Sequence, residues 1–306
     1  SPNFASNKKM TQEVKQIPLD IEYKKHKNIS PDDIKQLREW VKTQPHLPEK
    51  HITDLDLILT YYCCDTSDLF TKQVLDLHFT LRTLYSKFFK DRVVDNVTTE
   101  TMLLPLSESD KNGVRYLYLA LRRSDPKFFN LVDAGRVLMM IIDLWQYEEG
   151  TWPGLSIIVD LELIVVGHLS RLEIWALRQI IHFLQEGMLV KINTIYFINA
   201  PNFTDKLLML LRPLMSKELY SKIQVHDSKA DLSRTDIPVH GFPKENGGKN
   251  LSHQEINEKL LAWLQSSSDY FVQENFKRVN ESLRPTRSAV VEEAIGVGSF
   301  KKLDID

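Results

Sequence analysis

Residues 155–161 read LSIIVDL and residues 192–198 read INTIYFI, two almost unbroken apolar runs of strand length. Between them, Leu169 to Glu186 has the apolar spacing of a helix, and Gly187 is a typical helix end. Strands that are buried on both faces read as continuous apolar runs of this kind. The order strand, helix, strand therefore predicts a mainly parallel sheet covered by helices.

The sequence before this unit changes in character. Residues 114–121, VRYLYLAL, form a further β-prone run, and a helix is expected from about Asn130 to Tyr147. Earlier still, only helical spacing is found, and Ser30-Pro31-Asp32-Asp33 is typical of a helix start. We predict an α/β protein in four parts: an N-terminal extension at 1–29, an all-helical lobe at 30–95, a sheet-containing domain at 96–280 and a C-terminal tail at 281–306.

Composition narrows the class of protein. The 306 residues carry 39 Lys and Arg against 41 Asp and Glu, a net charge of -2, which gives no support to a nucleic-acid partner. The only cysteines, Cys63 and Cys64, are adjacent and poorly placed to bridge each other, which fits a reducing compartment. No apolar stretch reaches the roughly 18 residues of a membrane span. We expect a cytoplasmic monomer that associates with membranes only peripherally.

Catalytic motifs are missing from the sequence. It contains no G-x-G-x-x-G or G-x-x-x-x-G-K-[ST] phosphate loop, no G-x-S-x-G elbow and no H-E-x-x-H metal motif. Asp160, Glu162 and His168 lie near the end of a predicted strand, where sheet proteins often place active sites. Loop capping explains them more simply than acid–base chemistry. We therefore predict no catalytic residue, no metal and no cofactor.

Six segments have a familiar order and spacing. Four lie in the sheet-containing part and two in the helical lobe: SIIVDLE (156–162), FINAPNF (197–203), LLRPLMSKELYSKIQVH (210–226), FPKENGG (242–248), LREWVKTQPHLPE (37–49) and FTLRT (79–83). Over about residues 30 to 275 the chain resembles the CRAL-TRIO family. The two segments of the helical lobe are similar to those of the insect members of that family. The resemblance implies a lipid-binding domain whose sheet floors an apolar cavity closed by a gate helix.

The gate of the family corresponds to about residues 199–222. This stretch contains TDKLLMLL (204–211), which carries more apolar surface than one core-facing stripe needs. The resemblance implies that Phe203, Leu207, Leu208 and Leu211 face the ligand when the gate is closed and a bilayer when it is open. The alternative is a helix buried in an ordinary core.

The resemblance also places the cavity walls. Candidate wall residues are Leu138, Ile142, Trp145, Leu155, Ile157, Ile180, Phe183, Leu184, Ile195 and Phe197. Leu138 and Ile142 stand at or near the positions of two serines in the tocopherol-binding members, so this wall is expected to be more apolar. Ser156, Thr194 or Tyr196 would then orient the ligand.

Some members bind phosphoinositide headgroups in a basic cleft beside the gate. Lys191 and Lys222 match two of its basic positions, and Lys217 adjoins Glu218, which replaces a third. The helical-lobe arginine of the family is not found in ILTYYCC (58–64). Lys191, Lys217 and Lys222 are either this headgroup site or ordinary surface charges, and the second interpretation is favoured.

The function expected from the resemblance is that of a carrier. It would shield one hydrophobic small molecule, such as a retinoid, tocopherol, carotenoid or other terpenoid-like lipid, and exchange it at membranes. The alternatives are a phosphoinositide-dependent lipid sensor or adaptor, a phospholipid transfer protein, and an enzyme that uses Asp160 and His168.

Overall fold

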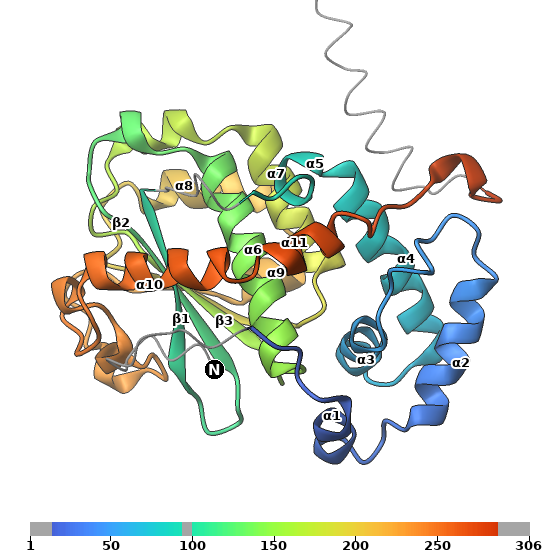
Figure 1. Ribbon diagram of the computed structural model, residues 1–306. Helices are drawn as coiled ribbons and strands as arrows, with labels where there is room; N and C mark the ends of the chain where they lie inside the picture. The colour runs from blue at the N-terminus through green and yellow to red at the C-terminus, as the bar shows by residue number, and fades with distance from the viewer. Residues whose placement is uncertain (1–13, 94–99, 287–306) are drawn as a thin grey trace, which may run out of the picture.

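The computed structural model describes residues 14–93 and 100–286 (Figure 1). Helices α1–α4 gather on one side of the molecule, and the sheet with α8 and α10 occupies the other. Of the expected N-terminal extension and C-terminal tail, residues 1–13 and 287–306 lie outside the described part of the chain.

The helical lobe begins where its capping residues predict. Its helices are α2 (Pro31–Lys42), α3 (Asp54–Cys63), α4 (Asp68–Leu84) and the short α5 (Ser86–Phe89), and α1 (Leu19–Lys25) precedes them. The Ser30 side chain accepts from the Asp33 amide while the Asp33 carboxylate accepts from the Ser30 amide, and Thr53 with Asp56 repeats this arrangement. The lobe has a core of its own, which includes Ile34, Leu37, Leu57, Ile58, Leu75 and Phe79. The predicted all-helical lobe is confirmed.

The sheet has five strands in the order β1-β2-β3-β4-β5: β1 (Thr101–Ser109), β2 (Arg115–Leu121), β3 (Leu155–Asp160), β4 (Ile192–Ile198) and β5 (Ile223–Val225). Only β1 and β2 pair antiparallel, so the predicted mainly parallel sheet is confirmed. The sequence did not predict β1 or β5. Pro105 weakens the strand signal of β1 but is tolerated at a sheet edge, and β5 is only three residues long.

Helices connect and cover the strands: α6 (Leu131–Glu149), α7 (Ile174–His182), α8 (Thr204–Leu211), α9 (Lys217–Ser221), α10 (His253–Gln265) and α11 (Ser268–Glu274). Short helical turns lie at Pro126–Phe128, Val166–Arg171, Arg212–Leu214, Leu232–Arg234, Val239–Gly241, Lys244–Asn246 and Glu281–Leu283.

The helix expected from Leu169 to Glu186 is broken into three pieces. A tight turn ends at Arg171, α7 follows, and a wide π-turn runs from Phe183 to Gly187. The wide turn presents the Gly187 carbonyl to His78 Nδ1 at 2.6 Å. A Cβ at Gly187 would lie 2.7 Å from the Phe183 ring, so a side chain there would force a rearrangement. The contact with the helical lobe therefore shapes the end of this helix.

The N-terminal part contains an ordered helix that the sequence did not predict. On α1, the buried Glu22 carboxylate accepts from the Thr151 amide and hydroxyl at 3.2 and 2.6 Å. Gly150, with φ of 75°, leaves the space that this carboxylate fills, because a Cβ there would lie 2.0 Å from Glu22 Oε1. Helix α1 is thus fixed to the end of α6.

Candidate functional site

One face of the sheet carries two continuous apolar rows. In the first, Leu103, Leu119, Val159 and Phe197 are neighbours across β1 to β4. In the second, Leu117, Ile157, Ile195 and Ile223 are neighbours across β2 to β5. Side chains of a strand alternate between the two faces, so each row is a direct consequence of the strand register.

All residues of these rows except Leu117 line an apolar pocket of about 250 Å³. Helix α6 contributes Ala134, Gly135 and Leu138 to one wall, and α7 with the turn after it contributes Leu177, Ile180, Ile181 and Leu184. Leu207 and Leu211 from α8 cover the pocket, with Met215 and Leu219 from the segment that follows. Phe129, Ile164 and Leu172 also line the pocket and are half-buried.

Polar groups are nearly absent from this pocket. Of the described residues that line it, only Thr101 and Asp160 carry polar side chains. Asp160 Oδ2 accepts from the Tyr118 hydroxyl at 2.6 Å, and Oδ1 accepts from Asn199 Nδ2 at 2.8 Å. Because these bonds already use the carboxylate, the pocket offers an occupant mainly apolar contact.

The structure brings together eight of the predicted ligand residues in this pocket: Leu138, Ile157, Ile180, Leu184, Ile195, Phe197, Leu207 and Leu211. They come from six separate segments of the chain. The sequence analysis missed other lining residues, among them Leu103, Leu121, Leu131, Gly135 and Ile223. The spacing of Leu131, Gly135 and Leu138 on one face of α6 would have indicated this wall, whereas β1 and β5 gave no strand signal.

The other six predicted ligand residues lie elsewhere. Ile142 and Phe183 line a small cavity between the two parts of the chain, because the second half of α6 is covered by the helical lobe. Trp145 packs on Trp152, with ring centroids 4.5 Å apart, and Leu155 is fully buried at the start of β3. Phe203 precedes the first turn of α8, and Leu208 packs against the main core outside the pocket.

The proposed polar handles are on the wrong face of the sheet. Ser156, Thr194 and Tyr196 alternate with Ile157 and Ile195, so they point away from the pocket. None of the three lines it. The expectation that they orient a ligand is therefore wrong, because the register assigns them to the face on which Phe242 packs against Tyr118.

Asp160 and His168 do not form an acid–base pair. His168 is buried, and its Nδ1 accepts from the Val165 amide at 3.0 Å. Its ring lies edge-on to Phe129, and burial lowers its pKa. The Asp160 carboxylate is bonded to Tyr118 and Asn199 instead. Both side chains thus hold loops and strands in place.

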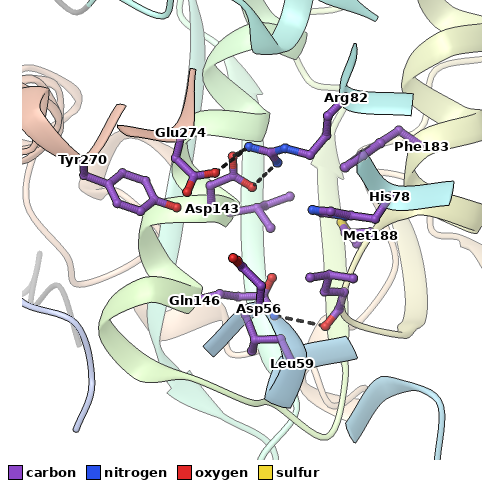
Figure 2. Close-up of a pocket in the computed structure, with 12 residues that line it drawn as sticks. Asp56, Leu59, His78, Arg82, Asp143, Gln146, Phe183, Met188, Tyr270 and Glu274 are labelled. Atoms are coloured by element: carbon purple, nitrogen blue, oxygen red, sulfur yellow. Dashed lines mark hydrogen bonds and ion pairs between the residues drawn. The ribbon is translucent and has the colours of Figure 1, made fainter. Parts of the chain in front are cut away.

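A second cavity is small and polar, with a volume of about 30 Å³ (Figure 2). It lies between α3, α4, α6 and α11, and Figure 2 shows Arg82 directed at the carboxylates of Asp143 and Glu274. Its size is that of a site for ordered water rather than for an organic ligand. This cavity belongs to the junction of the two parts of the chain.

The three lysines of the possible headgroup site lie beside acidic groups or in solvent. Lys191 Nζ contacts the Asp65 carboxylate at 2.6 Å, and Lys222 Nζ contacts Glu218 at 2.9 Å. The hydrogen bond and charge of Lys222, with the charge of Lys191, lower the pKa of Glu218. Lys217 is exposed. Two of these lysines thus already have a carboxylate partner.

Two further features bear on the class of site. Within residues 14–93 and 100–286, no helix is both long and apolar enough to cross a membrane. In the same ranges, no cluster of three or more His, Cys, Asp or Glu side chains is arranged to hold a metal ion.

Comparison with known proteins gives consistent matches. Residues 99–248 match the CRAL/TRIO domain, and residues 26–99 match the family described as "Pinta-like, UBA domain". The "Alpha-tocopherol transfer protein-like" proteins of Homo sapiens and Pongo abelii are each 23% identical over 188 residues, which is 60% of this chain and 54% of theirs. The mouse protein of that name is 24% identical over 182 residues, 58% of this chain and 52% of its own. The match thus spans about half the length of these relatives.

Among solved structures, Sfh5 aligns with a TM-score of 0.43 at 15% identity, over 78% of this chain and 98% of its own. The domain match, the tocopherol-transfer-like relatives and the apolar pocket on a mainly parallel sheet agree with the motifs in the sequence. The chain belongs to the CRAL-TRIO family.

Proposed function

We propose that this protein is a carrier that binds one hydrophobic molecule beneath α8 and exchanges it at a membrane surface. The observation that carries the proposal is the pocket itself, whose described lining residues are apolar except for Thr101 and Asp160. Burial of apolar surface contributes roughly 25 cal/mol per Å² to the free energy of binding, so such a pocket retains a ligand that is poorly soluble in water. The relatives named "Alpha-tocopherol transfer protein-like" support a lipid of this kind.

The chemistry of the pocket narrows the ligand class. Most lining residues are Leu, Ile or Val, and Phe129 and Phe197 are the aromatic ones among them. A buried polar group without a hydrogen-bond partner costs free energy, so a ligand with an amide or carboxylate at depth is disfavoured. We infer a mainly hydrocarbon ligand, whose polar group, where it has one, remains near solvent.

Helix α8 is the part of the cover that can act as a gate. Leu207 and Leu211 face the pocket, while Met209 on the opposite side of the helix is 75% exposed. Other exposed apolar side chains are close in the sequence to the lining residues Phe129, Ile164 and Leu172, namely Phe128, Val165, Val166, Ile174 and Trp175. Arg123 lies 4.5 Å and Lys127 5.0 Å from the ring of Phe128. Apolar side chains flanked by cations are typical of surfaces that meet lipid headgroups.

Extraction tests the proposal directly. The purified protein is extracted with organic solvent, and the extract is analysed by mass spectrometry, with about one hydrophobic molecule per chain expected. Ala134→Leu, which fills the pocket wall, is expected to lower occupancy severalfold. Ala262→Leu, on the exposed face of α10, is the matched control and is expected to leave occupancy unchanged.

Two results would count against a carrier. One is an empty pocket that also takes up no 1,6-diphenylhexatriene, a hydrocarbon whose fluorescence appears in apolar surroundings. The other is equal occupancy in A134L and A262L, which would place the bound molecule outside this pocket.

A further inference from the structure

The segment between β4 and α8 contains one residue in the left-handed conformation, Asn199. Asn199 has φ of 52°, in the left-handed region that Asn tolerates better than most residues. Pro201 has a fixed φ and restricts Ala200 to extended conformations. The Ala200 amide is also held, since it donates to the His226 carbonyl at 3.0 Å. Asn199 is therefore a suitable hinge for a swing of α8, because Ala200 and Pro201 beside it are restrained.

Asn199 is held in this conformation from the neighbouring strand. Asp160, at the carboxyl end of β3, pairs with Ile198 across the sheet, and its Oδ1 accepts from Asn199 Nδ2 at 2.8 Å. The same oxygen accepts from the Glu162 amide at 3.0 Å. A carboxylate with fixed donors on both oxygens cannot rotate freely, so it sets the position of the Asn199 side chain.

Asp160 also holds other parts of the fold beside this hinge. The residue is 3% exposed and borders the pocket, but its side chain points to the other face of the sheet, where Oδ2 accepts from the Tyr118 hydroxyl at 2.6 Å. Asn246 Nδ2 lies 3.4 Å from the same oxygen. The carboxylate thus contacts the hinge of α8, strand β2 and the loop at 244–246.

We propose that Asp160 is a positioning residue that keeps α8 closed by holding Asn199 in the left-handed conformation, and that breaking this contact is a step in ligand release. The proposal rests on the carrier function proposed above. In this proposal Asp160 controls the rate at which the ligand is exchanged and does not itself bind the ligand. Asn199 is the residue through which that control reaches α8.

Three single variants separate this role from a purely structural one. N199G keeps the left-handed backbone without strain but lacks the side-chain donor. N199D keeps the size of the side chain but places a carboxylate against Asp160. N193D is the matched control, because it introduces the same charge on β4 at an exposed asparagine. The double variant N199D/D160N removes the repulsion between the two carboxylates of N199D, because residue 160 becomes neutral.

The readout is the release of pre-loaded 1,6-diphenylhexatriene to phosphatidylcholine vesicles, followed by its fluorescence, beside the melting temperature of each variant. N199G lacks the hydrogen bond to the Asp160 carboxylate, and the loss of this bond is expected to speed release of the probe by about ten-fold. N199D is expected to release faster still, since repulsion replaces attraction. N193D should match the wild type, and N199D/D160N should release more slowly than N199D, because the repulsion is removed.

Each outcome either supports or overturns the proposed role of Asp160. Wild-type loading with unchanged release in N199G and N199D would overturn the role of Asp160 and leave the carrier function standing. Equal acceleration in N193D would overturn it as well, because the effect would then be one of surface charge. A wild-type protein that loads no probe would overturn both proposals. If N199D fails to fold, N199G alone still decides between changed and unchanged release.

Discussion

Arg82 on α4 donates hydrogen bonds from both terminal nitrogens to the carboxylate of Asp143 on α6, at 2.9 and 2.8 Å. A third bond, at 2.8 Å, joins the same guanidinium to Glu274 on α11. Burial acts to raise the pKa of Asp143, but the charges and hydrogen bonds of Arg82 and Arg92 outweigh it and hold that pKa well below its usual range. One buried guanidinium thus joins the helical lobe, the pocket helix and the C-terminal helix.

Arg82→Ala is expected to destabilise the protein by about 3–5 kcal/mol, because it leaves two buried carboxylates without this partner. Urea unfolding at pH 7 measures the change. Lys24→Ala, which removes an exposed ion pair with Asp20, serves as the control and should leave the midpoint unchanged. A loss in R82A as small as that of the control would contradict a stabilising role for the cluster.

The second prediction concerns acid. Burial lowers the pKa of His78 to about 4, and its Nδ1 lies 2.6 Å from the Gly187 carbonyl. Between pH 6.5 and 4 the unfolded chain binds a proton at this residue that the folded protein does not. The contribution of neutral His78 to the free energy of unfolding is therefore fully present above pH 6.5 and decreases as the pH falls toward 4. From pH 6.5 to 5 the loss from His78 amounts to roughly 2 kcal/mol.

His78→Gln, which does not titrate and can still donate to Gly187, should reduce the loss of unfolding free energy between pH 7.5 and 5 by about that amount. His51→Gln, at an exposed histidine, is the matched control. The same acid sensitivity in H78Q and the wild type would show that His78 is not the group that binds this proton.

The third prediction tests the cover of the pocket. Leu207→Asp with Leu211→Asp is expected to abolish retention of the bound molecule, because a charge in an apolar cavity costs several kcal/mol or forces the helix outward. Melting temperature and occupancy are measured together. Met209→Asp, on the exposed side of the same helix, should keep both. Collapse of the fold in the double variant would instead identify α8 as a helix of an ordinary core.

The fourth prediction concerns the membrane. Met209→Ser is expected to weaken sedimentation with phosphatidylcholine vesicles severalfold, since it removes an exposed apolar side chain from the helix above the pocket. Leu69→Ser is the matched control, because Leu69 is 70% exposed but lies on α4 of the helical lobe. Equal loss in the two variants would show that vesicle contact is a general effect of surface hydrophobicity.

Local patterns in the sequence were enough to predict most of the elements. Ser30 caps a helix where one was expected, and the runs at 155–161 and 192–198 are neighbouring parallel strands. Such signals are carried by residues within one or two turns or along one strand, so a single segment contains all the information. The resemblance to the CRAL-TRIO family then predicted that a helical lobe precedes a lipid-binding domain.

The composition of the candidate site was predictable only in part. Ile157, Ile195 and Leu207 were expected in the pocket and line it. Ile142 and Trp145 were also expected there and do not line it, although they lie on the same stripe of α6 as Leu138, which does. Periodicity indicates which face of a helix is buried but not what covers each half of that face. Here the helical lobe covers the second half of α6, and no local pattern shows where it packs.

The sequence by itself determined the alternation of strands and helices, the capped ends of the helices and the apolar character of the pocket, because each depends on residues close together in the chain. The tertiary structure alone decided the strand register that turns Ser156 and Tyr196 away from the pocket, and the cluster of Arg82, Asp143 and Glu274, whose members are 61 and 192 positions from Arg82. Contacts across such separations form only when whole elements pack, and charged side chains carry no periodic signal of their partners.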